Sequence, residues 1–205
     1  MMTTKLLLTT AAAALLLPLT ASPARAQVQG SSAMDPRIAE AVKPLPADLQ
    51  AGATVVAYDK TTGARTVLRQ GKNDIECQPK ADDGFVRCYN KILGPRRDME
   101  AKLRAEKKSD KEVTDAVQAA VKAGTIQPPK FGTMSYRYSD DPQRIKLLWV
   151  MSVPNATPEQ LGVSTVSQRD AALKGHGMPW MMLPGTPGAH IMIPINATPL
   201  SSTDK

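Results

Sequence analysis

The sequence predicts an α+β domain with a small antiparallel sheet, two central helices and one disulfide-linked hairpin. Three observations support this fold class. Apolar and polar residues alternate with the period of a strand before residue 94 and after residue 133, whereas between these segments the apolar residues follow helical spacing. Strands that flank a helical middle are typical of the α+β class. The chain also has only two cysteines, which lie on either side of a turn signal.

The first 26 residues predict a secretory signal peptide. Lys5 precedes an apolar stretch, Leu6–Leu17, that is too short to span a bilayer as a helix. The small residues of Ala24–Ala26 are typical of a signal-peptidase site. We therefore expect residues 27–205 to form a single exported α+β domain, periplasmic or secreted, with no membrane span after cleavage and with a disordered tail at 199–205.

Local signals then predict the first elements of this domain. Asp35-Pro36 is typical of a capped helix start, and we expect that helix to run through Val42 and to end before Pro44. Ala53–Tyr58 and Arg65–Arg69 predict a hairpin around a polar turn. Together with the cysteine hairpin, these strands predict a small antiparallel meander.

Cys77 and Cys88 predict an intramolecular disulfide, because export takes them into an oxidising compartment. A loop over Ala81–Gly84 places the two cysteines directly opposite each other, at the separation a disulfide requires. A two-residue turn at Asp83-Gly84 would instead place Cys77 opposite Asn90. The alternative, a redox-active or metal-binding thiol pair, matches neither a Cys-x-x-Cys motif nor a four-ligand zinc site.

The middle of the chain predicts two helices. The first begins at Gly94-Pro95, runs to about Lys108 and has a narrow apolar stripe, so we expect it on the surface. The second begins with a capping box, Ser109 with Glu112, carries Ala and Val at helical spacing, and ends at Gly124. We interpret its apolar stripe as a core contact.

The second half predicts strands again. Alternation over residues 134–138 is typical of a half-buried strand, and the apolar run within residues 145–153 is typical of a central strand covered on both faces. Residues 154–177 are polar, and we expect them to be irregular. Apolar segments at residues 178–183 and 189–195 predict the last two strands.

The net charge is +7, and removal of residues 1–26 leaves a mild +5. Between Lys91 and Lys122 basic and acidic side chains are interspersed, which is typical of a solvated helix surface rather than of a track for a polyanion. We therefore expect no nucleic-acid partner.

Both histidines fall in one window that is rich in methionine. Thioether sulfur and imidazole suit Cu(I), and the residue types are similar to those of periplasmic copper carriers that use His, Met and a neighbouring Trp. The alternative interpretation is that methionine fills irregular gaps in a core with few aromatic residues. If the segments are strands, their His and Met faces are able to meet. The candidate ligands are His176, Met178, Met182, His190 and Met192.

For catalysis the sequence offers little. It lacks Gly-x-Ser-x-Gly and His-Glu-x-x-His motifs and a phosphate-binding loop. A triad around His190, with Asp140 or Asp141 and a loop serine such as Ser164 or Ser167, remains a hypothesis. The catalytic assignment stays open, and we favour a noncatalytic protein without a cofactor.

A set of short segments is spread over about residues 45–195: Leu45–Leu49, Ala51–Val55, Leu68-Arg69, Gly71, Asn73, Cys77, Cys88-Tyr89 and Pro184–Met192. Together these segments resemble a group of bacterial secreted proteins with a signal peptide and two cysteines. The resemblance implies a bacterial exported protein and carries no activity, cofactor or site. We therefore expect a noncatalytic binding or structural module of the bacterial envelope with an unidentified protein or small ligand as its partner; the alternatives are a periplasmic copper-binding protein and a hydrolase with a site around His190.

Overall fold

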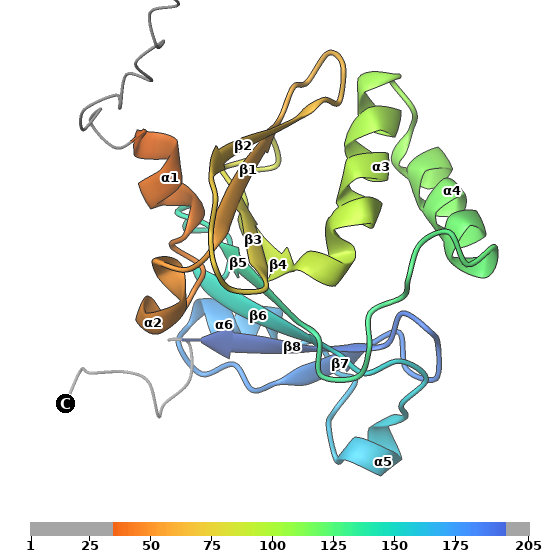
Figure 1. Ribbon diagram of the computed structural model, residues 1–205. Coiled ribbons are helices and arrows are strands. Elements are labelled where there is room, and N and C mark those ends of the chain that lie inside the picture. Colours follow the sequence, from red (N-terminus) through yellow and green to blue (C-terminus); the bar gives the residue numbers. More distant parts are fainter. Residues whose placement is uncertain (1–34, 196–205) are drawn as a thin grey trace, which may run out of the picture. The chain divides into compact units, whose positions relative to one another are not determined.

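The computed structural model describes residues 35–195, so the predicted signal peptide and the predicted tail lie outside the described residues. Within this part, eight strands form one sheet (Figure 1). The α+β class is therefore confirmed. The strands are β1 (Thr54–Tyr58), β2 (Arg65–Arg69), β3 (Ile75–Gln78), β4 (Val86–Asn90), β5 (Met134–Tyr138), β6 (Leu147–Ser152), β7 (Trp180–Met182) and β8 (His190–Ile195).

The sheet is large and mixed, so the expectation of a small antiparallel sheet is wrong. Its strand order is β2-β1-β3-β4-β5-β6-β8-β7, and β1 pairs with β3 in parallel while the other neighbours are antiparallel. The predicted meander fails because the chain leaves β2 and crosses the end of β1. Gly71 permits this crossing, because a Cβ atom there would lie 2.3 Å from the backbone oxygen of Gly52. The backbone N–H groups of Lys72 and Asn73 donate to the same oxygen.

Six α-helices are described, so the expectation of two central helices is incomplete. The two predicted in the middle are present as α3 and α4, and the Ser109 capping box is confirmed. Two short helices occupy the segment that we expected to be irregular. No helix among residues 35–195 combines the length and apolar character that a membrane span requires. The helices are α1 (Pro36–Ala41), α2 (Ala47–Gln50), α3 (Gly94–Ala105), α4 (Asp110–Lys122), α5 (Pro158–Leu161) and α6 (Arg169–Leu173), and a 3-10 turn, η1 (Lys91–Leu93), precedes α3.

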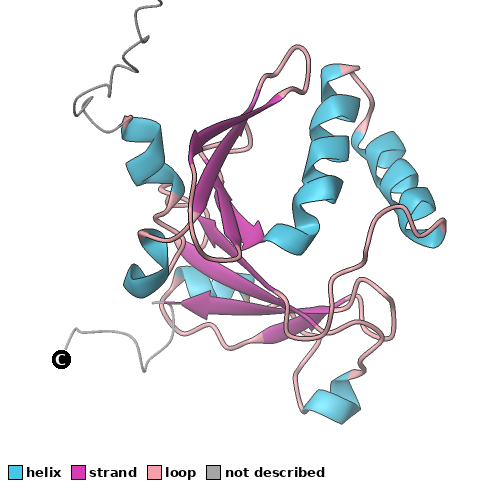
Figure 2. Ribbon diagram, in the orientation of Figure 1, coloured by secondary structure: helices cyan, strands magenta, loops and turns pink. Residues whose placement is uncertain are grey.

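Helices cover both faces of the sheet. Figures 1 and 2 show α1 and α2 on one face of the first strands and α3 on the other. We call the first the cysteine face, because both cysteines point to it together with buried residues of α1 such as Ile38 and Ala41. The opposite face carries a second apolar cluster, in which Ala172 of α6 packs with Leu148, Val150, Trp180 and Met192. Thus each face has its own core.

Candidate functional site

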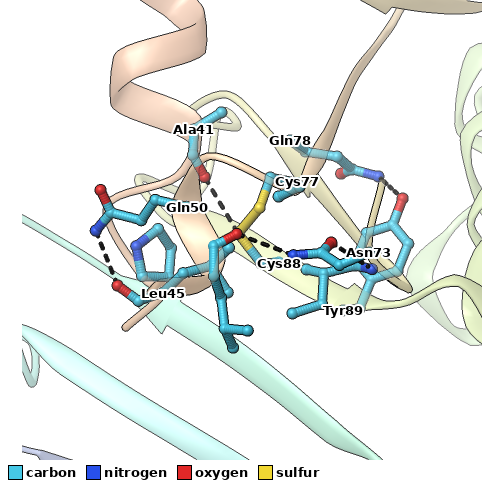
Figure 3. The surroundings of a disulfide bond; sticks show 12 residues. Ala41, Leu45, Gln50, Asn73, Cys77, Gln78, Cys88 and Tyr89 are labelled. Carbon is cyan, nitrogen blue, oxygen red and sulfur yellow. Dashed lines mark hydrogen bonds between the residues drawn. A yellow bond between two sulfur atoms is a disulfide. The ribbon is translucent and has the colours of Figure 1, made fainter. Parts of the chain in front are cut away.

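The Cys77–Cys88 disulfide is confirmed, with Cα atoms 4.0 Å apart (Figure 3). The two cysteines are directly opposite in the β3–β4 pair, which is the register that the longer loop predicts. Both are buried, and the Cys88 sulfur lies 3.2 Å from the carbonyl oxygen of Ala41 in α1. The disulfide therefore joins β3 to β4 and contacts α1. Neither cysteine has a free thiol.

The opposite face of the same strands is polar. Because side chains alternate along a strand, Gln78 of β3, Arg87 and Tyr89 of β4, and Arg137 of β5 point away from the cysteines. Tyr89 is buried, and the Gln78 amide donates to its hydroxyl at 2.9 Å (Figure 3). Polar side chains are thus placed on a covered face, where each of them needs a partner.

Helix α3 contacts this face through polar groups. The Tyr58 hydroxyl donates to Asp98 Oδ1 at 2.6 Å, and the Arg97 guanidinium lies 5.2 Å from the centre of the Tyr89 ring. Arg97 also donates to the buried Glu100 at 2.8 Å. Burial alone would raise the pKa of Glu100, but the neighbouring arginines outweigh it and lower that pKa. The helix therefore brings a further positive charge to the face that holds Arg87 and Arg137.

Arg137 is a charged residue of this face that makes no ion pair with the described part of the chain. It lies directly opposite Arg87, and like charges in that position repel. Arg87 has the carboxylate of Asp83 as its partner, whereas the guanidinium of Arg137 makes no ion pair or hydrogen bond within residues 35–195. Burial, together with the charges of Arg87 and Arg97, lowers the pKa of Arg137 to about 10, although the nearby Asp83 carboxylate acts in the opposite direction. At neutral pH the side chain is therefore still charged.

A pocket of about 330 Å³ lies over Arg137, and we call it the arginine pocket. Two further arginines, Arg144 and Arg169, stand in its wall. The rest of the wall is largely apolar and includes the core residues of the face opposite the cysteines. A neighbouring hollow of about 410 Å³ shares part of this wall. The remaining lining residues are Phe85, Asp141, Gln143, Ile145, Leu148, Trp180 and Met192.

The two wall arginines already have partners. Arg144 Nε lies 3.2 Å from Asp141 Oδ2, and its guanidinium lies 4.4 Å from the centre of the Phe85 ring. Arg169 donates to the backbone oxygen of Gln143 at 2.9 Å. Both keep further N–H groups, since a guanidinium has five. The pocket therefore combines one cation that has no ion pair within residues 35–195 with additional donors, an arrangement that suits an anion.

The predicted His and Met residues come together in part. In the β7–β8 pair, Met182 lies directly opposite His190 and Trp180 opposite Met192, so these four side chains share a face. Met182 is exposed, whereas Met192 is buried in the apolar cluster. His190 Nδ1 lies 2.8 Å from the backbone oxygen of Gly188. Since that oxygen only accepts, Nδ1 is the donor of this contact, and in the neutral imidazole Nε2 then has the free lone pair.

Other candidate residues lie apart from this pair. His176 and Met178 precede β7 and are exposed. His190 pairs with Ser152 at the end of β6, whereas Asp140 and Asp141 lie in the turn that leads into the start of β6. The structure therefore does not bring the predicted acidic partners to His190. Among the described residues, no three His, Cys, Asp or Glu side chains gather to hold a metal.

Comparisons of the chain with protein-family models, with curated proteins and with solved structures give no match. The site is therefore argued from geometry.

The sequence reasoning missed the arginine pocket, because its arginines come from separate segments. One signal was present: Arg137 stands between Tyr136 and Tyr138 in an alternating strand, so its side chain shares a sheet face with Ser135 and points away from both tyrosines.

Proposed function

We propose that this chain is a noncatalytic binding module whose arginine pocket holds a small anion. The observation that carries the proposal is the charged, partly buried Arg137, which lies directly opposite Arg87 and whose guanidinium makes no ion pair or hydrogen bond within residues 35–195. Removing a cation from water without an ion pair is costly, and a bound anion would supply that partner. The donors of Arg144 and Arg169 support the same ligand from the wall.

The chemistry of the lining supports binding rather than catalysis. Its described residues include no histidine, cysteine, serine or lysine, which supply most catalytic nucleophiles and bases. The carboxylate of Asp141 is already bound to Arg144. The disulfide supports an oxidising compartment, which agrees with the exported, periplasmic or secreted protein that the leader predicts.

A thermal-shift experiment tests this function. Wild-type protein, Arg137→Met and the control Arg37→Met, which removes an exposed charge on α1, are heated with sulfate, acetate, citrate or 4-phenylbutanoate. We expect at least one anion to raise the Tm of the wild type and of Arg37→Met but not that of Arg137→Met. Equal responses of all three proteins to every anion would contradict the proposal.

A second candidate function is Cu(I) binding, and the β7–β8 register favours it. Met182 and His190 are cross-strand neighbours, and the contact of His190 Nδ1 with Gly188 leaves Nε2 as a ligand atom. An exposed thioether beside an imidazole is a donor set that suits Cu(I). Met192 lies next along the same face but is buried, so we expect Met182 and His190 to bind first.

Competition with bicinchoninate measures this affinity directly. Met182→Leu and His190→Ala should each weaken Cu(I) binding. Met181→Leu changes a buried methionine of the other face and should leave it unchanged. Equal affinities for all variants would exclude this pair as the site.

A further inference from the structure

The charges around the arginine pocket limit the charge of its ligand. Arg144 is paired with Asp141, and Arg87 is paired with Asp83. At the exposed rim, Arg169 Nη1 lies 3.4 Å from Asp170. Arg137 therefore contributes the one positive charge of this group that has no carboxylate partner within the described part of the chain. A ligand with one negative charge neutralises the site, whereas a second negative charge would meet Asp141.

The wall beyond Arg137 is apolar. Ile145, Leu148, Trp180 and Met192 line it, and all four belong to the apolar cluster that α6 covers. Leu148 is directly opposite Arg137 in the β5–β6 pair, so the apolar wall begins next to the guanidinium. Such a wall offers little to a hydrated polar ion, but it gains from burial of a hydrocarbon group.

We propose that the arginine pocket selects an amphipathic monoanion, a carboxylate joined to an aromatic or aliphatic group. This inference rests on the proposed function and specifies its ligand class. The carboxylate lies on Arg137, within reach of the donors of Arg144 and Arg169, and the apolar group lies against Trp180 and Met192. The pocket volume of about 330 Å³ is at the small end of ligand pockets, which fits a compact molecule.

Trp180 provides an internal reporter. The chain has two tryptophans, and Trp149 lies on the cysteine face, where it packs against Tyr136. The Trp149→Phe variant therefore leaves Trp180 as the single tryptophan of the protein. Its fluorescence is titrated with 4-phenylbutanoate, and ligands that give no signal are measured by displacement of this acid. The other probes are neutral 4-phenylbutanol, the dianion succinate and inorganic phosphate.

We expect 4-phenylbutanoate to bind, and each of the other probes to bind about tenfold more weakly or worse. Arg137→Met in the same background should remove the preference for the acid over the alcohol, whereas Arg37→Met should keep it. If succinate or phosphate binds as tightly as the acid and depends on Arg137, the amphipathic ligand is excluded and anion binding stands. If no anion depends on Arg137, both proposals fail.

Discussion

Replacement of Arg137 by methionine should stabilise the protein in the absence of ligand. The substitution removes a charge that is partly buried, lies directly opposite Arg87 and makes no ion pair or hydrogen bond within residues 35–195. Methionine keeps an unbranched apolar side chain of similar length, so the packing against Leu148 is largely retained. The change therefore isolates the cost of the charge.

The magnitude follows from the pKa of Arg137, which burial lowers from the usual arginine range to about 10 in the folded protein. A difference of this size disfavours the charged form by about 3 kcal/mol. The guanidinium is a base with a lowered pKa, so this penalty is complete below pH 10 and is relieved only as the pH rises from there toward the pKa of arginine in the unfolded chain. Because methionine fills the space imperfectly, we expect a net gain in the free energy of unfolding of about 2 kcal/mol at neutral pH.

Urea unfolding, followed by circular dichroism at pH 7, measures this gain. In a domain of this size 2 kcal/mol also corresponds to an increase in Tm of about 6 °C. Arg37→Met is the control, because it removes the same charge from an exposed ion pair on α1 and should leave the urea midpoint nearly unchanged. If Arg137→Met is less stable than the wild type, the guanidinium already has a compensating partner and the reasoning fails.

Three further predictions concern the scaffold. Replacing Cys77 and Cys88 by alanine should lower the free energy of unfolding by about 3 kcal/mol, because the disulfide joins residues 11 positions apart; an unchanged urea midpoint would contradict this. Gly71→Ala should lower the free energy of unfolding in urea by more than about 2 kcal/mol, because the added Cβ would meet fixed backbone atoms. Gly132→Ala, where φ is +80° and the space around the Cβ is open, should lower it by only about 1 kcal/mol. Equal losses in the two variants would refute this packing argument. The Glu112 carboxylate accepts hydrogen bonds from the backbone and side chain of Ser109, which lowers the pKa of Glu112 to about 2. The stabilisation of α4 by this carboxylate is therefore present above pH 4.5 and is lost toward pH 2. An NMR titration midpoint near 4.5 for Glu112 would show that the capping box is not formed.

Elements with a strong local signal could be predicted from the sequence. The Asp35-Pro36 helix start, the Ser109 capping box and the left-handed Gly124 each depend on contacts within one turn of chain. The Cys77–Cys88 register also follows from local rules, because loop length and strand spacing leave one arrangement that permits a disulfide.

The order of the strands could not be predicted, because it depends on non-local pairing. The sequence contains no local signal that β3 lies beside β1 rather than beside β2. The crossing at Gly71 is explained only when the backbone of Gly52 and Ala53 is in view. For the same reason the sequence predicts a small sheet, whereas the structure has one large sheet of eight strands.

The candidate sites divide in the same way. The meeting of Met182 with His190 could be predicted from alternation along two neighbouring strands. The pairing of Arg137 with Arg87 joins segments that are 50 residues apart in the chain, and Arg169 comes from a helix that the sequence did not predict. The interspersed charges between Lys91 and Lys122 predict a solvated helix surface, whereas the fold buries Glu100 of that range beside Arg96 and Arg97.

The most direct test of anion binding is an NMR spectrum of the arginine Nε–Hε groups, recorded with and without 4-phenylbutanoate. The Arg137 signal is assigned from its loss in Arg137→Met. We expect this signal to show the largest shift on addition of the acid, with smaller shifts for Arg144 and Arg169. A spectrum in which the acid binds while the Arg137 signal stays in place would contradict the central claim.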